Sequence, residues 1–154
     1  HYKHAPLTKE VLQWMRNCWE KDDTYDKDHP PLKLYLARPS FRQSARAVRN
    51  EMEIIEYLKD RGFTIFRGNE GFPRHIEMFQ NAEIIIGAHG AAFFNCVLCR
   101  NNPIVLEFCS ASRLVPMWKT QAETMGMDRY NFIPCSDDDQ MNFDIDIDII
   151  DKYI

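Results

Sequence analysis

Short apolar runs alternate with longer amphipathic stretches along the chain. Mostly apolar runs predict strands over residues 32–37, 63–66, 83–86, 104–108 and 130–133. Apolar residues at helical spacing predict helices over 7–20, from about 44 to 61, and over 71–82, 91–100 and 110–126. Helices between successive strands act as crossovers, which make the strands parallel and cover both faces of the sheet. We therefore predict an α/β fold, a Rossmann-like three-layer arrangement around a parallel sheet of about five strands.

The two ends of the chain depart from this repeating pattern. Residues 21–31 are polar and end in two prolines, which predicts a loop or linker. Asp and Ile alternate over residues 144–149, which predicts an edge strand with one solvated face. We expect an N-terminal helix and linker over residues 1–31 and a Rossmann-like domain over residues 32–154.

The turn after the strand at 83–86 is the most informative stretch. It has the sequence Gly-Ala-His-Gly-Ala-Ala over residues 87–92, in which His89 is the one large polar side chain. Small residues let a ligand approach the backbone, and the first amides of a following helix suit an anion. Gly87 and Gly90 are therefore candidate ligand contacts. Such residues can also serve packing alone, with His89 as a hydrogen-bonded turn residue, and the spacing leaves both interpretations open.

Composition and charge narrow the class of ligand. The chain has 154 residues, of which 45% are hydrophobic and 27% charged, so we expect one globular domain. No apolar run approaches the ~20 residues that span a bilayer, and we expect no membrane contact from this chain. The net charge of −4 argues against a nucleic-acid polymer as a partner. A local cationic stretch over residues 38–49 favours a small polyanion such as a diphosphate.

Four arginines carry that local charge. Arg38 follows the strand at 32–37, while Arg42, Arg46 and Arg49 lie at spacings that would align them on one helix face. Guanidinium groups match phosphate oxygens two at a time, so Arg38, Arg46 and Arg49 are candidate diphosphate ligands. The alternative is a solvated basic face paired with the glutamates that follow in the sequence.

Further candidates lie where another strand ends. Open parallel sheets bind ligands at the carboxyl ends of their strands, and Glu107, Ser110 and Ser112 follow or end the strand at 104–108. A carboxylate there can accept two hydrogen bonds from a ribose diol, which makes Glu107 with these serines a candidate nucleotide site. A surface salt bridge of Glu107 is the alternative.

Three consecutive aspartates after the strand at 130–133 raise a metal alternative. Clustered carboxylates suit hard cations, and Asp137–Asp139 would be the residues that hold one. A polar turn is the competing interpretation of the same residues.

Taken together, these motifs resemble glycosyltransferase family 61. They are Leu-Ala-Arg at 36–38, Arg-Asn-Glu-Met-Glu at 49–53, Ile-Ile-Ile-Gly-Ala-His-Gly-Ala-Ala at 84–92, Val-Leu-Glu at 105–107 and Asp-Ile-Asp-Ile-Asp at 144–148. Their order covers residues 32–154. The resemblance implies a nucleotide-sugar-dependent transferase of the two-Rossmann (GT-B) type, of which this chain would be the donor-binding half. An acceptor-binding half would lie outside it.

The resemblance also implies roles for individual residues. Arg38 and the turn at His89 and Gly90 would contact the diphosphate and the sugar of the donor, and Glu107 would contact the ribose. We expect the donor to be a UDP-sugar. Inversion at the sugar is implied, and His89 is the candidate base for the acceptor hydroxyl of a glycan or glycoprotein. No bound cofactor or divalent metal is required if arginines and a helix end neutralise the leaving group. Two alternatives remain: a metal-dependent sugar transferase using Asp137–Asp139, and a nucleotide- or glycan-binding module without turnover.

Overall fold

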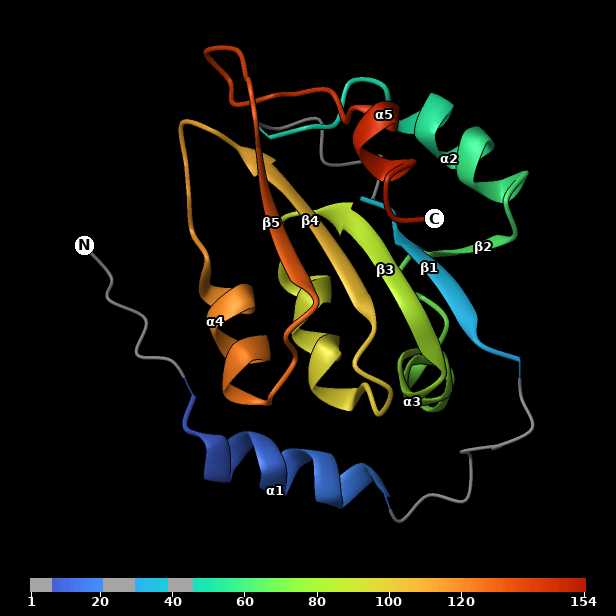
Figure 1. Ribbon diagram of the computed structural model, residues 1–154, viewed down its shortest axis with the longest axis vertical. Helices are drawn as coiled ribbons and strands as arrows, with labels where there is room; N and C mark the ends of the chain where they lie inside the picture. Colours follow the sequence, from blue (N-terminus) through green and yellow to red (C-terminus); the bar gives the residue numbers. More distant parts are fainter. Residues whose placement is uncertain (1–6, 21–29, 39–45) are drawn as a thin grey trace.

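A five-stranded parallel sheet forms the centre of the molecule. The computed structural model describes residues 7–20, 30–38 and 46–154 (Figure 1). In chain order the elements are α1 (Lys9–Glu20), β1 (Leu32–Leu36), α2 (Glu51–Lys59), β2 (Phe63–Phe66), α3 (Phe72–Gln80), β3 (Ala82–Ala88), the 3-10 helix η1 (Ala91–Leu98), β4 (Ile104–Ser110), α4 (Met117–Thr124), β5 (Tyr130–Cys135) and α5 (Ile147–Ile150). The strands lie in the order β2-β1-β3-β4-β5, all parallel. The predicted Rossmann-like α/β fold is confirmed.

Each face of the sheet is covered by its own hydrophobic core, because alternate strand residues point to opposite faces. Leu34, Leu36, Ile85 and Val105 lie in a core with residues of α1, α3, η1 and α4. Their neighbours in the strands lie in a second core with residues of α2 and α5. Figure 1 shows α2 and α5 together on one side of the sheet, apart from the other helices. This division confirms the three layers.

Helix α1 is attached to the first core. Leu12 is fully buried in that core, and Arg16 Nε donates to the backbone oxygen of Val97 at 3.1 Å. Within the parts of the chain that the structure describes, no helix has both the length and the apolar character that a membrane crossing needs. The linker predicted over 21–31 falls largely on residues 21–29, outside the described residues.

The predicted edge strand at 144–149 is wrong. Residues 147–150 form the short helix α5, and the side chain of Asp146 caps it by accepting from the backbone N–H of Asp148. The backbone of Ile145 does not pair with a strand, because the amide side chain of Asn50 both donates to its oxygen at 2.9 Å and accepts from its N–H at 3.0 Å. Ile145 and Ile150 are thus buried in the second core with residues of α2 without forming a strand.

Two predicted helix starts are also wrong. The second helix begins at Glu51 rather than near residue 44, which lies outside the described residues; residues 46–50 form a bend, an isolated bridge of Val48 with Phe143, and a turn. Arg46 and Arg49 therefore do not share a helix face. The helix predicted over 110–126 begins only at Met117, so Ser110 and Ser112 lie before it.

Candidate functional site

The strand order creates a crevice between β1 and β3. The chain leaves β1 to form β2 on one side and leaves β3 to form β4 on the other side. At such a switch point the connecting segments diverge, and open α/β sheets bind ligands there, outside the carboxyl ends of the strands. The local sequence permits close packing at this point, because Gly87 pairs with Leu36 in the register of the two strands.

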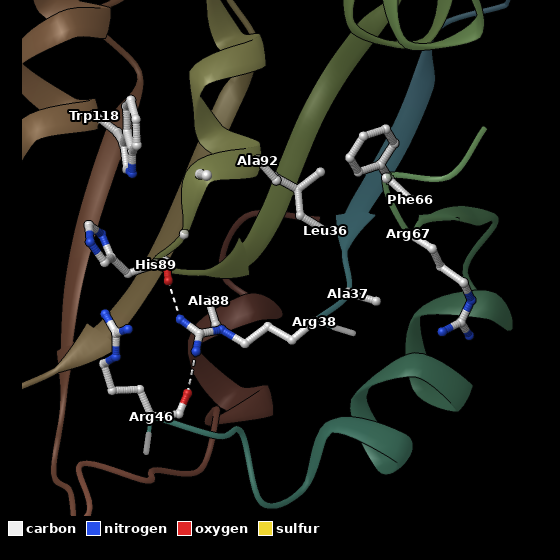
Figure 2. Close-up of a pocket in the computed structure, with 13 residues that line it drawn as sticks. Leu36, Ala37, Arg38, Arg46, Phe66, Arg67, Ala88, His89, Ala92 and Trp118 are labelled. Carbon is white, nitrogen blue, oxygen red and sulfur yellow. Dashed lines mark hydrogen bonds between the residues drawn. The ribbon is translucent and has the colours of Figure 1, made fainter. Parts of the chain in front are cut away.

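A pocket of about 410 Å³ occupies this crevice (Figure 2). Its walls come from residues 36–38 at the end of β1, 66–68 at the end of β2 and 88–92 at the end of β3, together with Arg46 and Trp118. The volume falls within the range of about 300–1,000 Å³ that small-molecule sites occupy. Three of the thirteen described residues that line the pocket are arginines and none is acidic. The pocket is thus cationic in a chain whose net charge is −4.

Arg38 cross-links the walls of the pocket. Its guanidinium donates to the backbone oxygen of Arg46 at 2.5 Å and to that of His89, as Figure 2 shows. Its backbone N–H donates to the carboxylate of Glu51 at 2.8 Å. The predicted ligand residue therefore also holds the turn after β3 against the segment before α2. Arg46 itself has a φ of 78°, an unusual conformation for a residue with a side chain.

Two backbone amides at the start of η1 have no hydrogen-bond partner among the described residues. The N–H groups of Ala91 and Ala92, at the start of η1, make no hydrogen bond to any residue that the structure describes, and both residues line the pocket. The indole Nε1 of Trp118, another residue of the pocket wall, is buried and likewise lacks a partner within those residues. A buried donor without an acceptor is costly, so the indole N–H is a candidate contact for a ligand oxygen, and the two amides are further donors beside the pocket.

His89 is held by a fully buried carboxylate. Its Nδ1 lies 2.6 Å from Oε1 of Glu107, a residue with 0% exposure, and Oε2 of Glu107 accepts from the hydroxyl of Tyr130 at 2.7 Å. Nε2 of His89 has no hydrogen-bond partner within the described part of the chain. Both oxygens of Glu107 are thus engaged inside the protein, and Glu107 does not line the pocket. Its predicted ribose contact stays a prediction.

The structure separates the remaining predicted site residues from the pocket. Gly87 lies inside the sheet, where a Cβ atom would come within 2.9 Å of Cβ of Leu36. The side chain of Arg49 is 46% exposed and forms ion pairs with Asp138 at 3.3 Å and Asp144 at 2.6 Å. Of the diphosphate residues predicted, Arg38, Arg46 and Gly90 come together. Arg42 lies outside the described residues.

Ser110 and Ser112 hydrogen-bond to a carboxylate of the protein and do not line the pocket. The hydroxyls of both serines donate to Asp137, that of Ser112 at 3.0 Å. These hydrogen bonds, that from Ser110 first, lower the pKa of Asp137 below its ordinary value. Asp138 accepts from the backbone of Gln140 and Asn142. Over residues 7–20, 30–38 and 46–154 no group of three His, Cys, Asp or Glu side chains is placed to share a metal ion.

Sequence reasoning missed three residues of this site. Arg67 follows β2 directly, so the strand-end rule that found Arg38 also points to it. Trp118 reaches the pocket from α4, and Tyr130 reaches Glu107 from the start of β5. Neither had a local signal, because both approach the site only through the packing of the first core.

Comparison with known proteins gives one family. The family model described as Glycosyltransferase 61 matches residues 1–106. The match includes Arg38, Arg46, Arg67 and His89 and ends immediately before Glu107. A search of curated proteins gave no match.

Proposed function

The chain belongs to glycosyltransferase family 61, and from this premise we propose that it binds a nucleotide-diphosphate sugar, UDP-linked, in the pocket between β1 and β3. The sugar is transferred to a hydroxyl of a glycan or glycoprotein with inversion. The chain acts as the donor-binding half of a GT-B enzyme, and a second half binds the acceptor.

The charge of the pocket carries this proposal. Arg38, Arg46 and Arg67 line one pocket, and none of the described residues in its wall is acidic. Guanidinium groups match phosphate oxygens in geometry as well as in charge, and the two unpartnered amides at the start of η1 add donors of the kind that bind diphosphates. A neutral sugar alone gives no reason for such a concentration of positive charge. A diphosphate does.

The same groups suit the chemistry of transfer. A base removes the proton of the acceptor hydroxyl, the oxygen attacks the anomeric carbon, and the bond to the diphosphate breaks with its electron pair leaving on the nucleotide. His89 Nε2, which has no partner within the described chain, is the proposed base. The arginines and amides stabilise the negative charge that develops on the leaving diphosphate, so we propose that catalysis does not require a divalent metal.

Thermal-shift measurements with uridine, UMP, UDP and a panel of UDP-sugars test the donor assignment. We expect UDP and one or more UDP-sugars, at ten times their Kd, to stabilise the protein by about 1.4 kcal/mol, a rise in Tm of about 3–5 °C. Uridine and UMP should give much smaller rises, because the pocket binds the diphosphate. Equal rises with UMP and UDP would contradict the proposal.

Product analysis then separates the functional alternatives. Transfer or hydrolysis of the bound donor, unchanged by a chelator, is the expected result. Loss of turnover on chelation would instead support the metal-dependent alternative. UDP binding without any turnover, also in the presence of an acceptor-binding half, would leave a nucleotide-binding module.

Replacing Trp118 by Phe tests the unpartnered indole donor. The phenyl ring retains apolar packing against Phe94, which Trp118 contacts edge-on, but removes Nε1. A neutral hydrogen bond contributes about 0.5–1.5 kcal/mol, so we expect the Kd for the UDP-sugar to rise about 2- to 12-fold with Tm nearly unchanged. Calorimetry measures this difference. Trp14→Phe is the control, since Trp14 is 66% exposed on α1 and does not line the pocket.

A further inference from the structure

Glu107 is a buried acidic residue beside the pocket whose role the proposed function does not explain. It is fully buried, yet it is a carboxylate, and burial of an ionised group is costly unless hydrogen bonds satisfy it. Both of its oxygens have such partners, His89 Nδ1 at 2.6 Å and the hydroxyl of Tyr130 at 2.7 Å. The strand register explains its position, because Glu107 pairs with Gly87 on β3 and thus lies beside the turn that carries His89.

Tyr130 restricts what Glu107 can do. Burial first, and then the nearby Cys96 and Glu107, raise the pKa of Tyr130 above its ordinary value, so its hydroxyl keeps its proton and donates it to Oε2. An ionised carboxylate is an acceptor only, which leaves Oε1 to accept from His89. Nδ1 of His89 must then carry a proton. In the neutral ring, Nε2 is left with its lone pair.

We propose that Glu107, oriented by Tyr130, is a positioning residue that fixes the Nδ1–H tautomer of His89 and presents the lone pair of Nε2 to the pocket. Figure 2 shows the His89 ring in the pocket, on the side of Trp118 and Arg46. The catalytic importance of this arrangement rests on the proposed function, in which Nε2 takes the proton of the acceptor hydroxyl. The tautomer itself does not rest on it.

The positioning role differs from the ribose role in a measurable way. A ribose contact contributes to donor binding, so its removal raises the Kd for UDP. A positioning residue leaves the nucleotide contacts intact, and its removal lowers kcat. Loss of a hydrogen-bonded partner of this kind lowers activity by about 10- to 100-fold where it has been measured in metal sites, and we expect a similar decrease here.

Nitrogen NMR on the ¹⁵N-labelled 154-residue chain tests the tautomer directly. Signals of His89 are identified by their loss in a His89→Gln variant. In the neutral ring, reached at alkaline pH, wild type should show a protonated Nδ1 and an unprotonated Nε2. A neutral wild-type ring that carries its proton on Nε2 would overturn the proposal without any variant.

Two variants complete the test. Glu107→Met removes the acceptor at similar volume, and Glu107→Met with Tyr130→Phe also removes the hydroxyl that would lose its partner. In both, we expect protonation to move from Nδ1 toward Nε2, kcat to fall about 10- to 100-fold and the UDP-induced rise in Tm to persist. Glu83→Gln, an exposed carboxylate near the other end of β3, is the control.

The outcomes distinguish the positioning role of Glu107 from the proposed function. An unchanged tautomer in the folded variants, or a lost UDP response with kcat retained, would refute the positioning role. A tautomer that changes as expected in a protein that transfers no sugar, even in the presence of an acceptor-binding half, would uphold the positioning role and refute the proposed function.

Discussion

Arg38→Ala should abolish the UDP-induced rise in Tm and reduce sugar transfer about 100-fold or more. Hydrogen bonds to charged groups contribute about 1.5–3 kcal/mol each, and a 100-fold decrease corresponds to about 2.7 kcal/mol. The substitution removes a cation from the pocket wall and also the two bonds to the backbone oxygens of Arg46 and His89. Both the binding of the diphosphate and the position of the turn after β3 are therefore affected. Each thermal shift is measured against the variant's own Tm.

Two further variants separate charge from geometry. Arg38→Lys keeps the charge, but one ammonium group does not reproduce the planar fork that joins two carbonyls, so we expect partial recovery of UDP binding and little recovery of transfer. Arg61→Ala is the control, because Arg61 is exposed, stacks on Tyr57 and does not line the pocket. A full UDP response in Arg38→Ala would remove Arg38 from the diphosphate site.

Gly87→Ala should lower the free energy of unfolding by about 1–3 kcal/mol. The new methyl group would lie 2.9 Å from Cβ of Leu36 and 3.0 Å from its backbone oxygen, contacts that force β1 and β3 apart. For a domain of this size each kcal/mol changes Tm by about 2–4 °C. Thermal and denaturant unfolding measure the loss. Wild-type stability in this variant would show that the two strands have room at the switch point.

Gly90→Ala, three residues further on, is the matched comparison. The φ of Gly90 is −177°, which any residue adopts, and its new Cβ would have only the backbone oxygen of Ala88 nearby, at an ordinary 3.6 Å. We expect stability within about 0.5 kcal/mol of wild type. Because Gly90 lines the pocket, the methyl group should instead weaken UDP binding. The same substitution thus affects the fold at one glycine and the ligand at the other.

The sequence predicted the sheet well because each of its strands is a short apolar run that the core on both faces requires. Residues 82–88 and 104–110 are buried almost throughout. A continuous apolar run of this length between two helices is typical of a buried parallel strand. The final segment was not predictable in this way. Its alternation of Asp and Ile satisfies a strand equally well, and the distant Asn50 side chain and the helix cap of Asp146 decide against one.

Site residues that lie next to the end of a strand could be predicted from the sequence. Site residues that tertiary packing brings to the pocket could not. Arg38 and His89 were found because each lies directly after a strand of the crevice. Glu107 was predicted to contact a ribose from its position alone. The local sequence did not show that His89 and Tyr130 hydrogen-bond to its two carboxylate oxygens. Arg49 was assigned to the ligand for its charge, whereas Asp138 and Asp144, some ninety residues later in the chain, pair with it.

The two cores also determine how much of the chain must fold together. Residues 1–106, which carry the family match, complete neither core. Ala122, Met127 and Tyr130 belong to the first, and Phe108, Phe143 and Ile150 to the second. The final third thus completes the core around the family-matched portion, and a cut at the edge of the matched region would expose apolar surface on both sides of the sheet.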